Sequence, residues 1–243
     1  MGTALADCAR GIGAVGNDGK YHILALLGDS TTPASTERTN GMDDAVAANP
    51  DVVLDRRFNT NWQTPKGHDL TANYLDWAAR HAVRPAGIWA ANDAMAIGAI
   101  QASEEHKLQP GRDLCVVGLN WSPEGLALVR DGKLAMTDGG HFLAGGWAMV
   151  MIRDYLVHGG KVPAGATTFE MEPVDAGNVE RFEAELGQRD WTRIDFKRFA
   201  RAGPDIAPGV DPGAASGTDN AYDFSLRQIL DNLKPASSGM TGN

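Results

Sequence analysis

Short apolar runs alternate with longer amphipathic segments along the first two thirds of the chain. Runs of β-branched and aliphatic residues predict buried strands at 21–27, 52–56, 86–90 and 114–118. Apolar residues at helical spacing predict helices at 3–14, 34–48, 67–82, 93–106, 123–130 and 141–158. This alternation of strands and helices predicts an α/β fold, with a parallel doubly wound sheet and helices on both faces.

The pattern becomes irregular toward the carboxyl terminus. The segments predicted next are a strand at 167–172, a helix at 178–186 and a strand at 194–196. Segment 203–219 holds three Pro and four Gly, which predicts a mobile loop before a final short amphipathic helix. We therefore expect a lobe at 1–163, bridging strands and a helix at 164–200, and an irregular tail at 201–243.

Composition removes several classes of function. The 243 residues carry a formal net charge of −9, which opposes nucleic-acid binding. No apolar run approaches the roughly 20 residues that span a bilayer, so membrane insertion is not expected. The sequence also opens without a signal peptide pattern. Cys8 and Cys115 lack the spacing of a metal site, and we expect two buried thiols, no metal and no cofactor.

One hypothesis is hydrolytic. A Gly-Asp-Ser motif ends at Ser30 after a predicted strand, Asn92 follows a later strand, and Asp138-Gly-Gly-His141 comes further on. This order resembles the GDS-type (SGNH) esterases. The resemblance implies Ser30 as nucleophile, His141 and Asp138 as base and orienting acid, and Asn92 in the oxyanion hole. The sequence departs from that pattern at Ala90, where a Gly is expected.

A second set of ordered motifs covers much more of the chain. The motifs are RxxG at 38–41, ND-x-x-A-x-GA at 92–99 and DGKLA-x-T at 131–137. Over about residues 4–163 the chain resembles the carboxyl-terminal lobe of type I periplasmic sugar-binding proteins and of the related lac-repressor effector domains. Later segments are similar to the branch that includes the autoinducer-2-binding protein. The resemblance implies that the amino-terminal lobe is missing, so we expect partly exposed apolar surface.

The same resemblance implies a ligand site at the carboxyl ends of the strands. Arg38 corresponds to the family's ligand arginine, which donates paired hydrogen bonds to hydroxyl groups. Trp62 corresponds to the stacking aromatic residue. Asn92 corresponds to a polar ligand residue, and Asp93 is expected either to contact the ligand or to cap the following helix.

Three further residues belong to the implied site. Asn120 stands where the sugar binders usually carry Asp, so a charge is lost while an acceptor is kept. Trp121 is expected to stack on the ligand in compensation. His141 falls next to the last ligand position, where the autoinducer-2 binder has an arginine, so a borate diester ligand is not expected.

The function implied by this resemblance is solute binding without catalysis, in the periplasm. The expected partners are a carbohydrate-like small molecule and either an ABC transporter permease or a sensor kinase. Two alternatives stay open, an esterase that uses Ser30 and His141 and the effector domain of a lac-repressor-like regulator. A regulator requires a helix-turn-helix, which this sequence does not contain.

Overall fold

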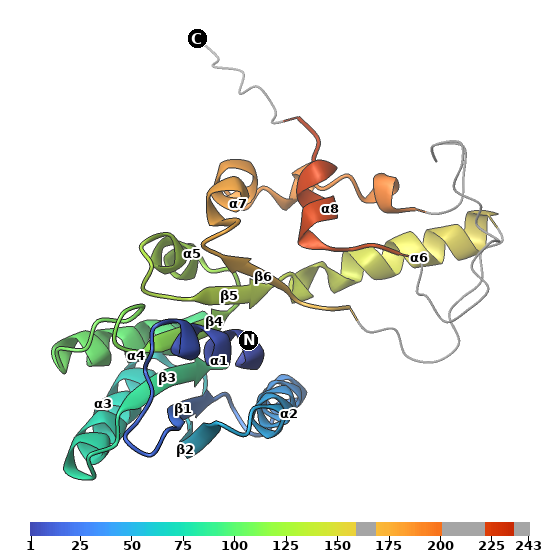
Figure 1. Cartoon of the computed structure of the whole chain (residues 1–243). Coiled ribbons are helices and arrows are strands. Elements are labelled where there is room, and N and C mark those ends of the chain that lie inside the picture. The colour runs from blue at the N-terminus through green and yellow to red at the C-terminus, as the bar shows by residue number, and fades with distance from the viewer. Residues whose placement is uncertain (159–168, 201–221, 236–243) are drawn as a thin grey trace. The chain divides into compact units, whose positions relative to one another are not determined.

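The structure, a computed structural model, describes residues 1–158, 169–200 and 222–235 (Figure 1). The chain divides into two compact units. The first comprises Met1–Gly139 and Pro173–Arg181, and the second comprises Gly140–Glu172 and Phe182–Asn243. The lobe boundary predicted at residue 163 and the loop predicted at 203–219 lie outside the described residues, and both remain predictions.

A six-stranded sheet forms the centre of the first unit. Its strands are β1 (Tyr21–Leu27), β2 (Val52–Asn59), β3 (Pro85–Ala90), β4 (Cys115–Leu119), β5 (Met136–Gly139) and β6 (Glu172–Asp175). The spatial order is β2-β1-β3-β4-β5-β6, and the pairs β1–β2, β1–β3, β3–β4 and β4–β5 are parallel. Leu24, Ile88 and Val116 are fully buried because helices cover both faces of the central strands.

The covering helices follow the order of the strands. They are α1 (Gly2–Gly11), α2 (Pro33–Ala48), α3 (Thr64–Arg80), α4 (Asp93–Glu105) and α5 (Pro123–Arg130). The chain moves from β1 to β2 in one direction and from β2 onward in the other. Right-handed crossovers therefore place α2 on one face and α3, α4 and α5 on the opposite face. α1 packs beside α2 and against β3 and β4, and the predicted doubly wound sheet is confirmed (Figure 1).

Side-chain caps fix where α2 and α5 begin. The Thr32 hydroxyl accepts a hydrogen bond from the Ser35 amide at 3.3 Å, and Pro33 occupies the first turn of α2. The Ser122 hydroxyl accepts one from the Gly125 amide at 3.0 Å at the start of α5. Because each cap follows a strand after a few residues, both helices start close to the carboxyl ends of the strands.

The strand expectations differ from the structure at three places. β2 continues to Asn59, beyond the predicted end at residue 56. β5 has no counterpart among the predicted strands, because four residues are too few for apolar periodicity to show. The predicted strand at 167–172 starts outside the described residues, and β6 occupies Glu172–Asp175 instead.

The predicted strand at 194–196 is wrong. Two 3₁₀ turns, Trp191–Arg193 and Phe196–Phe199, flank Ile194, which forms an isolated antiparallel bridge with Leu233. The turns begin where Asp190 and Asp195 accept hydrogen bonds from backbone amides two residues later. These local side-chain bonds compete with an extended strand.

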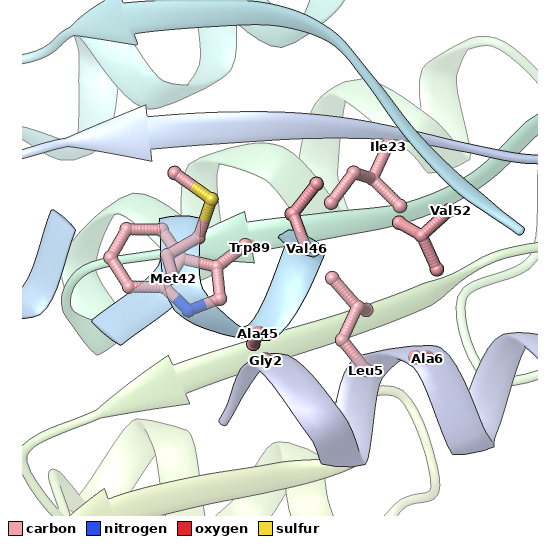
Figure 2. Close-up of a pocket in the computed structure, with 9 residues that line it drawn as sticks. All are labelled: Gly2, Leu5, Ala6, Ile23, Met42, Ala45, Val46, Val52 and Trp89. Carbon is pink, nitrogen blue, oxygen red and sulfur yellow. The ribbon is translucent and has the colours of Figure 1, made fainter. Parts of the chain in front are cut away.

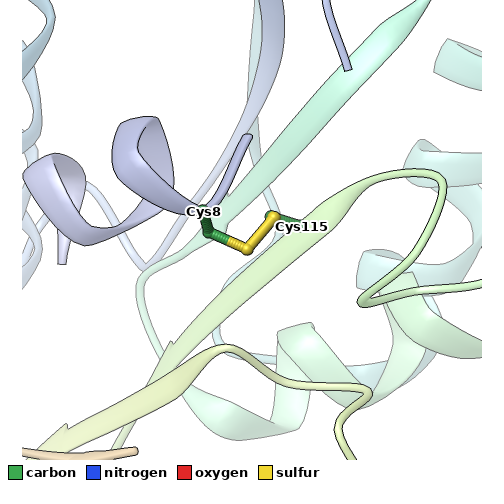
Figure 3. The surroundings of a disulfide bond; sticks show 2 residues. All are labelled: Cys8 and Cys115. Atoms are coloured by element: carbon green, nitrogen blue, oxygen red, sulfur yellow. A yellow bond between two sulfur atoms is a disulfide. The ribbon is translucent and has the colours of Figure 1, made fainter. Parts of the chain in front are cut away.

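A disulfide joins Cys8 of α1 to Cys115 at the start of β4 (Figure 3). The expectation of two buried thiols is therefore wrong. α1 packs against β4 and brings the two Cα atoms to 6.1 Å, although 107 residues separate them in the sequence. A pairing over that separation leaves no local signal, because connectivity depends on the fold rather than on spacing.

A small apolar void lies between α1, α2 and the sheet (Figure 2). Its lining consists of Gly2, Leu5, Ala6, Ile23, Met42, Ala45, Val46, Val52 and Trp89. The void has a volume of about 10 Å³, at the lower limit for holding one water molecule. It is a packing gap in the core and is too small for a solute.

Aromatic side chains organise the second unit. α6 (Ala144–His158) supplies Trp147, whose ring stacks on Phe224 with the centroids 4.5 Å apart. Phe196 and Phe199 contact the same indole, with centroid distances of 4.9 and 5.0 Å. The unit also contains α8 (Leu226–Asp231) and most of α7 (Val179–Leu186), which begins in the first unit.

One side of α6 is exposed and apolar. The exposed large apolar residues of this helix are Met149, Ile152, Tyr155, Leu156 and Val157. Met149 and Leu156 are 63% and 71% exposed, and they share a helix face with Ile152. Even so, no helix in the described ranges is long and apolar enough to cross a bilayer.

Candidate ligand-binding site

The candidate site lies where parallel strands of the first unit end. Trp62 follows β2, Asn92 follows β3 and Asn120 follows β4, while Arg38 lies in the second turn of α2. In open α/β sheets, ligands bind in the crevice outside the carboxyl ends of the strands. The structure thus brings these four predicted residues to the expected edge of the sheet.

Arg38 lies half-buried against Trp62. Its Nη1 donates a hydrogen bond to the Ala91 carbonyl oxygen at 2.7 Å, and its Cζ lies 5.3 Å from the centroid of the Trp62 ring. Burial lowers the pKa of the guanidinium, and the nearby carboxylate of Asp93 acts in the opposite direction. Arginine nevertheless stays protonated at neutral pH, so the site holds a partly desolvated cation.

Trp62 has an unusual backbone and a close glycine neighbour. Asn61 and Trp62 have φ angles of 51° and 65°, in the region that favours glycine. A Cβ atom at Gly28 would overlap the Trp62 indole, so the indole lies directly over the backbone at the end of β1. The Gly-Asp-Ser motif therefore supplies a glycine that makes room for Trp62. Such strained positions cluster at ligand sites.

Asn92 holds the loop that carries Trp62. Its side-chain oxygen accepts a hydrogen bond from the Met95 amide at 2.8 Å and caps α4. Its Nδ2 donates to the Trp62 carbonyl oxygen at 3.4 Å. Asn92 is 7% exposed, and both ends of its amide are used inside the protein. In this structure Asn92 positions the site residues around it.

Asp93 is not the cap of α4, which corrects one expectation. Its carboxylate accepts hydrogen bonds from the Ser122 amide and hydroxyl, at 2.9 and 2.8 Å, and from the Thr137 hydroxyl at 2.7 Å. Asp93 is 1% exposed, and burial raises the pKa of its carboxyl while these bonds lower it, with a net rise. The carboxylate joins α4 to the loop after β4 and to β5.

Asn120 and Trp121 follow β4 with positive φ angles of 136° and 50°. The backbone N–H of Asn120 donates a hydrogen bond to the Asp138 carbonyl oxygen at 2.7 Å, which holds the end of β4 to β5. Trp121 is 1% exposed, and a Cβ atom at Gly139 would overlap its indole. The structure therefore packs Trp121 in the interior, beneath the edge where a ligand would stack.

His141 is exposed and belongs to the second unit, so it is not among the residues assembled in the first. Its ring lies edge-on to Phe142, with the centroids 5.5 Å apart. Ser30 is an exposed loop residue of the first unit. Asp138 is buried, which raises the pKa of its carboxyl, and it accepts a hydrogen bond from the α-amino group of Met1 at 3.4 Å. The structure thus gives no support to a hydrolytic triad.

Sequence reasoning missed the residues that hold the site together. Ser122 and Thr137 bind Asp93, and Gly28 and Gly139 make room for the two indoles. A Ser before Pro123 is a visible helix-cap signal, but nothing local indicates that its hydroxyl also reaches Asp93. Among the described residues, no group of His, Cys, Asp or Glu side chains could hold a metal ion.

The chain is similar to known proteins in sequence and in fold. Residues 1–161 match the family model described as a periplasmic binding protein domain. The ribose import binding protein of Salmonella typhimurium is 35% identical over 116 residues, which is 47% of this chain and 36% of that protein. The xylitol-binding protein of Mycolicibacterium smegmatis is 28% identical over 120 residues, which is 49% of this chain and 32% of that protein.

Solved structures show the same fold over more of the chain. A periplasmic sugar-binding protein from Pseudomonas fluorescens has a TM-score of 0.72 and 28% identity, covering 94% of this chain and 66% of that one. The arabinose-binding component of a Shewanella transporter has a TM-score of 0.58 and 25% identity, covering 74% of this chain and 58% of that one. The matched region is about a third of the length of the curated relatives. Because the family model matches more than half of the chain, the chain belongs to the family of periplasmic binding protein domains.

Proposed function

We propose that this chain is a lobe of a periplasmic solute-binding protein that recognises a sugar-like, polyhydroxylated ligand. The observation that carries the proposal is the pairing of Arg38 with Trp62 at the carboxyl ends of the strands. A guanidinium donates parallel hydrogen bonds to neighbouring hydroxyl groups, and an indole face packs on the C–H side of a sugar ring. The names of the relatives, which include ribose and xylitol binders, support the ligand class.

The disulfide supports the periplasm as the compartment. Disulfides persist in oxidising environments and are rare in the bacterial cytoplasm. The Cys8–Cys115 bond lies in the first unit, the same unit that carries the site. We further propose that the chain is not an enzyme, and that it serves an ABC importer or a sensor kinase. The family match supports this over an esterase or a transcription regulator.

The test is a titration of the whole chain with pentoses, hexoses and polyols, followed by NMR at the Trp62 indole N–H and by calorimetry. We expect binding in the millimolar range, because solute-binding proteins gain affinity by closing two lobes around the ligand. Trp62→Ala is expected to abolish the response. Trp77→Ala is the matched control, because Trp77 carries a similar stacked arginine, Arg56, with Cζ 4.1 Å from its ring centroid.

Two results would contradict the proposal. One is a chain that responds to no sugar or polyol at concentrations up to tens of millimolar. The other is equal loss of binding in Trp62→Ala and Trp77→Ala, which would assign the effect to general damage. A submicromolar affinity would instead contradict the view that the chain holds only half of a site.

A further inference from the structure

No carboxylate in the described part of the chain contacts the guanidinium of Arg38, although the buried carboxylate of Asp93 lies near enough to act on its charge. The guanidinium makes one hydrogen bond, to the uncharged carbonyl oxygen of Ala91, and one cation–π contact, to Trp62. It forms no ion pair with any described carboxylate. This hydrogen bond uses only Nη1 of the guanidinium, so the other N–H groups of Arg38 are available to a ligand.

Three carboxylates lie close to the carboxyl ends of the strands, and none of them contacts Arg38. Asp93 is buried, and it accepts three hydrogen bonds from Ser122 and Thr137. Asp138 is 8% exposed and lies on β5. Asp29 accepts hydrogen bonds from the amide and hydroxyl of the residue two positions later, at 2.9 and 2.7 Å. None of these carboxylates neutralises Arg38 by direct contact.

The remaining residues of the site are uncharged. Trp62 provides an aromatic ring and Asn120 a side-chain amide, while both ends of the Asn92 amide are bonded inside the protein. A half-buried cation interacts with an opposite charge more strongly than an exposed one, because the local dielectric constant is lower. The described half of the site therefore presents one positive charge that no carboxylate contacts directly, beside a surface suited to a sugar ring.

We propose that the ligand carries a carboxylate as well as hydroxyl groups, as a sugar acid does, and that Arg38 pairs with this carboxylate. This inference rests on the proposed function and specifies its ligand class. The planar fork of arginine matches a carboxylate with two parallel N–H···O bonds. A single guanidinium balances one negative charge, which favours a carboxylate over a doubly charged phosphate. Trp62 then packs on the carbon chain or ring of the same ligand.

The experiment compares matched ligands on the whole chain. D-galacturonate is titrated against D-galactose, and D-gluconate against D-glucitol, at low salt and at about 0.5 M NaCl. We expect each acid to bind roughly tenfold more tightly than its neutral partner at low salt, and the difference to shrink at high salt. Galactose 6-phosphate is the third arm, and we expect it to bind more weakly than galacturonate.

The variants assign the preference to one side chain. Arg38→Gln is expected to bring the ratio of acid to neutral affinity close to one, and Arg38→Lys to keep part of it because the charge remains. Arg56→Gln, which removes the exposed arginine stacked on Trp77, is expected to leave the ratio unchanged. Far-UV circular dichroism of each variant checks that the fold is retained.

The possible failures are distinguishable. Equal binding of acids and neutral sugars overturns the carboxylate inference and leaves the proposed function standing. Tighter binding of the sugar phosphate, or an acid preference that survives Arg38→Gln, also overturns the inference. Absence of binding by every ligand overturns the inference and the proposed function together.

Discussion

Different interactions stabilise the inside of each of the two units. In the first unit, a disulfide, a parallel sheet and the buried Asp93 carboxylate fix helices to strands that lie far apart in the sequence. In the second unit, aromatic rings around Trp147 provide the contacts, and one face of α6 is exposed and apolar. The candidate site residues other than His141 lie in the first unit.

This contrast separates two uses of apolar surface. The first unit buries its apolar strands on both faces, so contacts among its own residues stabilise its fold. The second unit leaves large apolar side chains in solvent, as surfaces that associate with other protein do. We therefore expect the units to respond separately to mutation, and three experiments test that separation.

The largest effect is expected from removing the disulfide. For a closed loop of roughly 100 residues, loss of the bond reduces the free energy of unfolding by about 4 to 5 kcal/mol in the chain-entropy model. In the double variant Cys8→Ala/Cys115→Ala, we expect faster hydrogen exchange in β1 and β4, measured by mass spectrometry. Exchange in α6 and α8 should stay the same.

A reductant provides the control for this comparison. Wild-type protein treated with a phosphine reductant should behave like the double variant, whereas the double variant should not respond to reductant. Faster exchange in α6 on loss of the disulfide would show that the two units are one cooperative structure. Unchanged exchange in β4 would show that the bond adds no stability to the first unit.

The second effect tests the aromatic cluster. Trp147→Ala removes contacts with Phe224, Phe196 and Phe199 and is expected to cost about 3 to 5 kcal/mol within the second unit. Exchange in α6 and α8 should increase, while β1 and β4 keep their protection. The same helix offers a control in Tyr155→Ala, which truncates an exposed ring and should change stability by at most about 0.5 kcal/mol. A similar loss of stability in both variants would show that Trp147 does not organise the second unit.

The smallest effect is a pH dependence confined to the first unit. His22 on β1 lies between two carboxylates, with Nδ1 2.8 Å from Asp55 Oδ1 and Nε2 3.1 Å from Asp18 Oδ2. The Tyr74 hydroxyl donates to the other oxygen of Asp55 at 2.9 Å. Burial lowers the pKa of His22, but the two carboxylates raise it by more, so the net pKa lies above its usual 6.5.

The sign of this dependence follows from the raised pKa. Protonated His22 stabilises the folded state at pH values below its unfolded pKa, and the contribution is lost as the pH rises through the folded pKa. We expect the first unit to lose less than about 1 kcal/mol between about pH 6 and 8, because burial of His22 offsets much of the stabilisation by the two carboxylates. His22→Gln should flatten this profile in denaturant titrations. His81→Gln, which changes an exposed histidine bonded to the Trp77 carbonyl oxygen, should leave it as in wild type.

Much of the first unit could be predicted from the sequence because its signals are local. The β1 strand matches the predicted range, and α5 begins and ends at the predicted residues. Apolar runs, helix caps and turn residues act over a few positions, and each leaves a pattern in the sequence. The 3₁₀ turns around Ile194 show the limit, since two Asp side chains override an apolar stretch of strand-like composition.

The candidate site was only partly predictable, because several of its features depend on contacts between distant segments. The position of Arg38 follows from its helix, but the burial of Trp121 depends on Gly139 and on the hydrogen bond to Thr137, at 3.2 Å. Asp93 has the sequence pattern of a helix cap, yet its partners lie 29 and 44 residues away. Pairings of this kind are set by the order of strands in the sheet, which a single sequence does not state.

The disulfide also adds a second covalent connection between distant parts of the chain. The bond closes a ring of backbone from Cys8 to Cys115, and β1, β2 and β3 all lie within that ring. A protease that cuts once inside the ring, for example in the exposed turn at Gly111, leaves the two pieces joined through sulfur. In an oxidising compartment the chain therefore survives a single cut there as one molecule, and the first helix stays attached to the sheet.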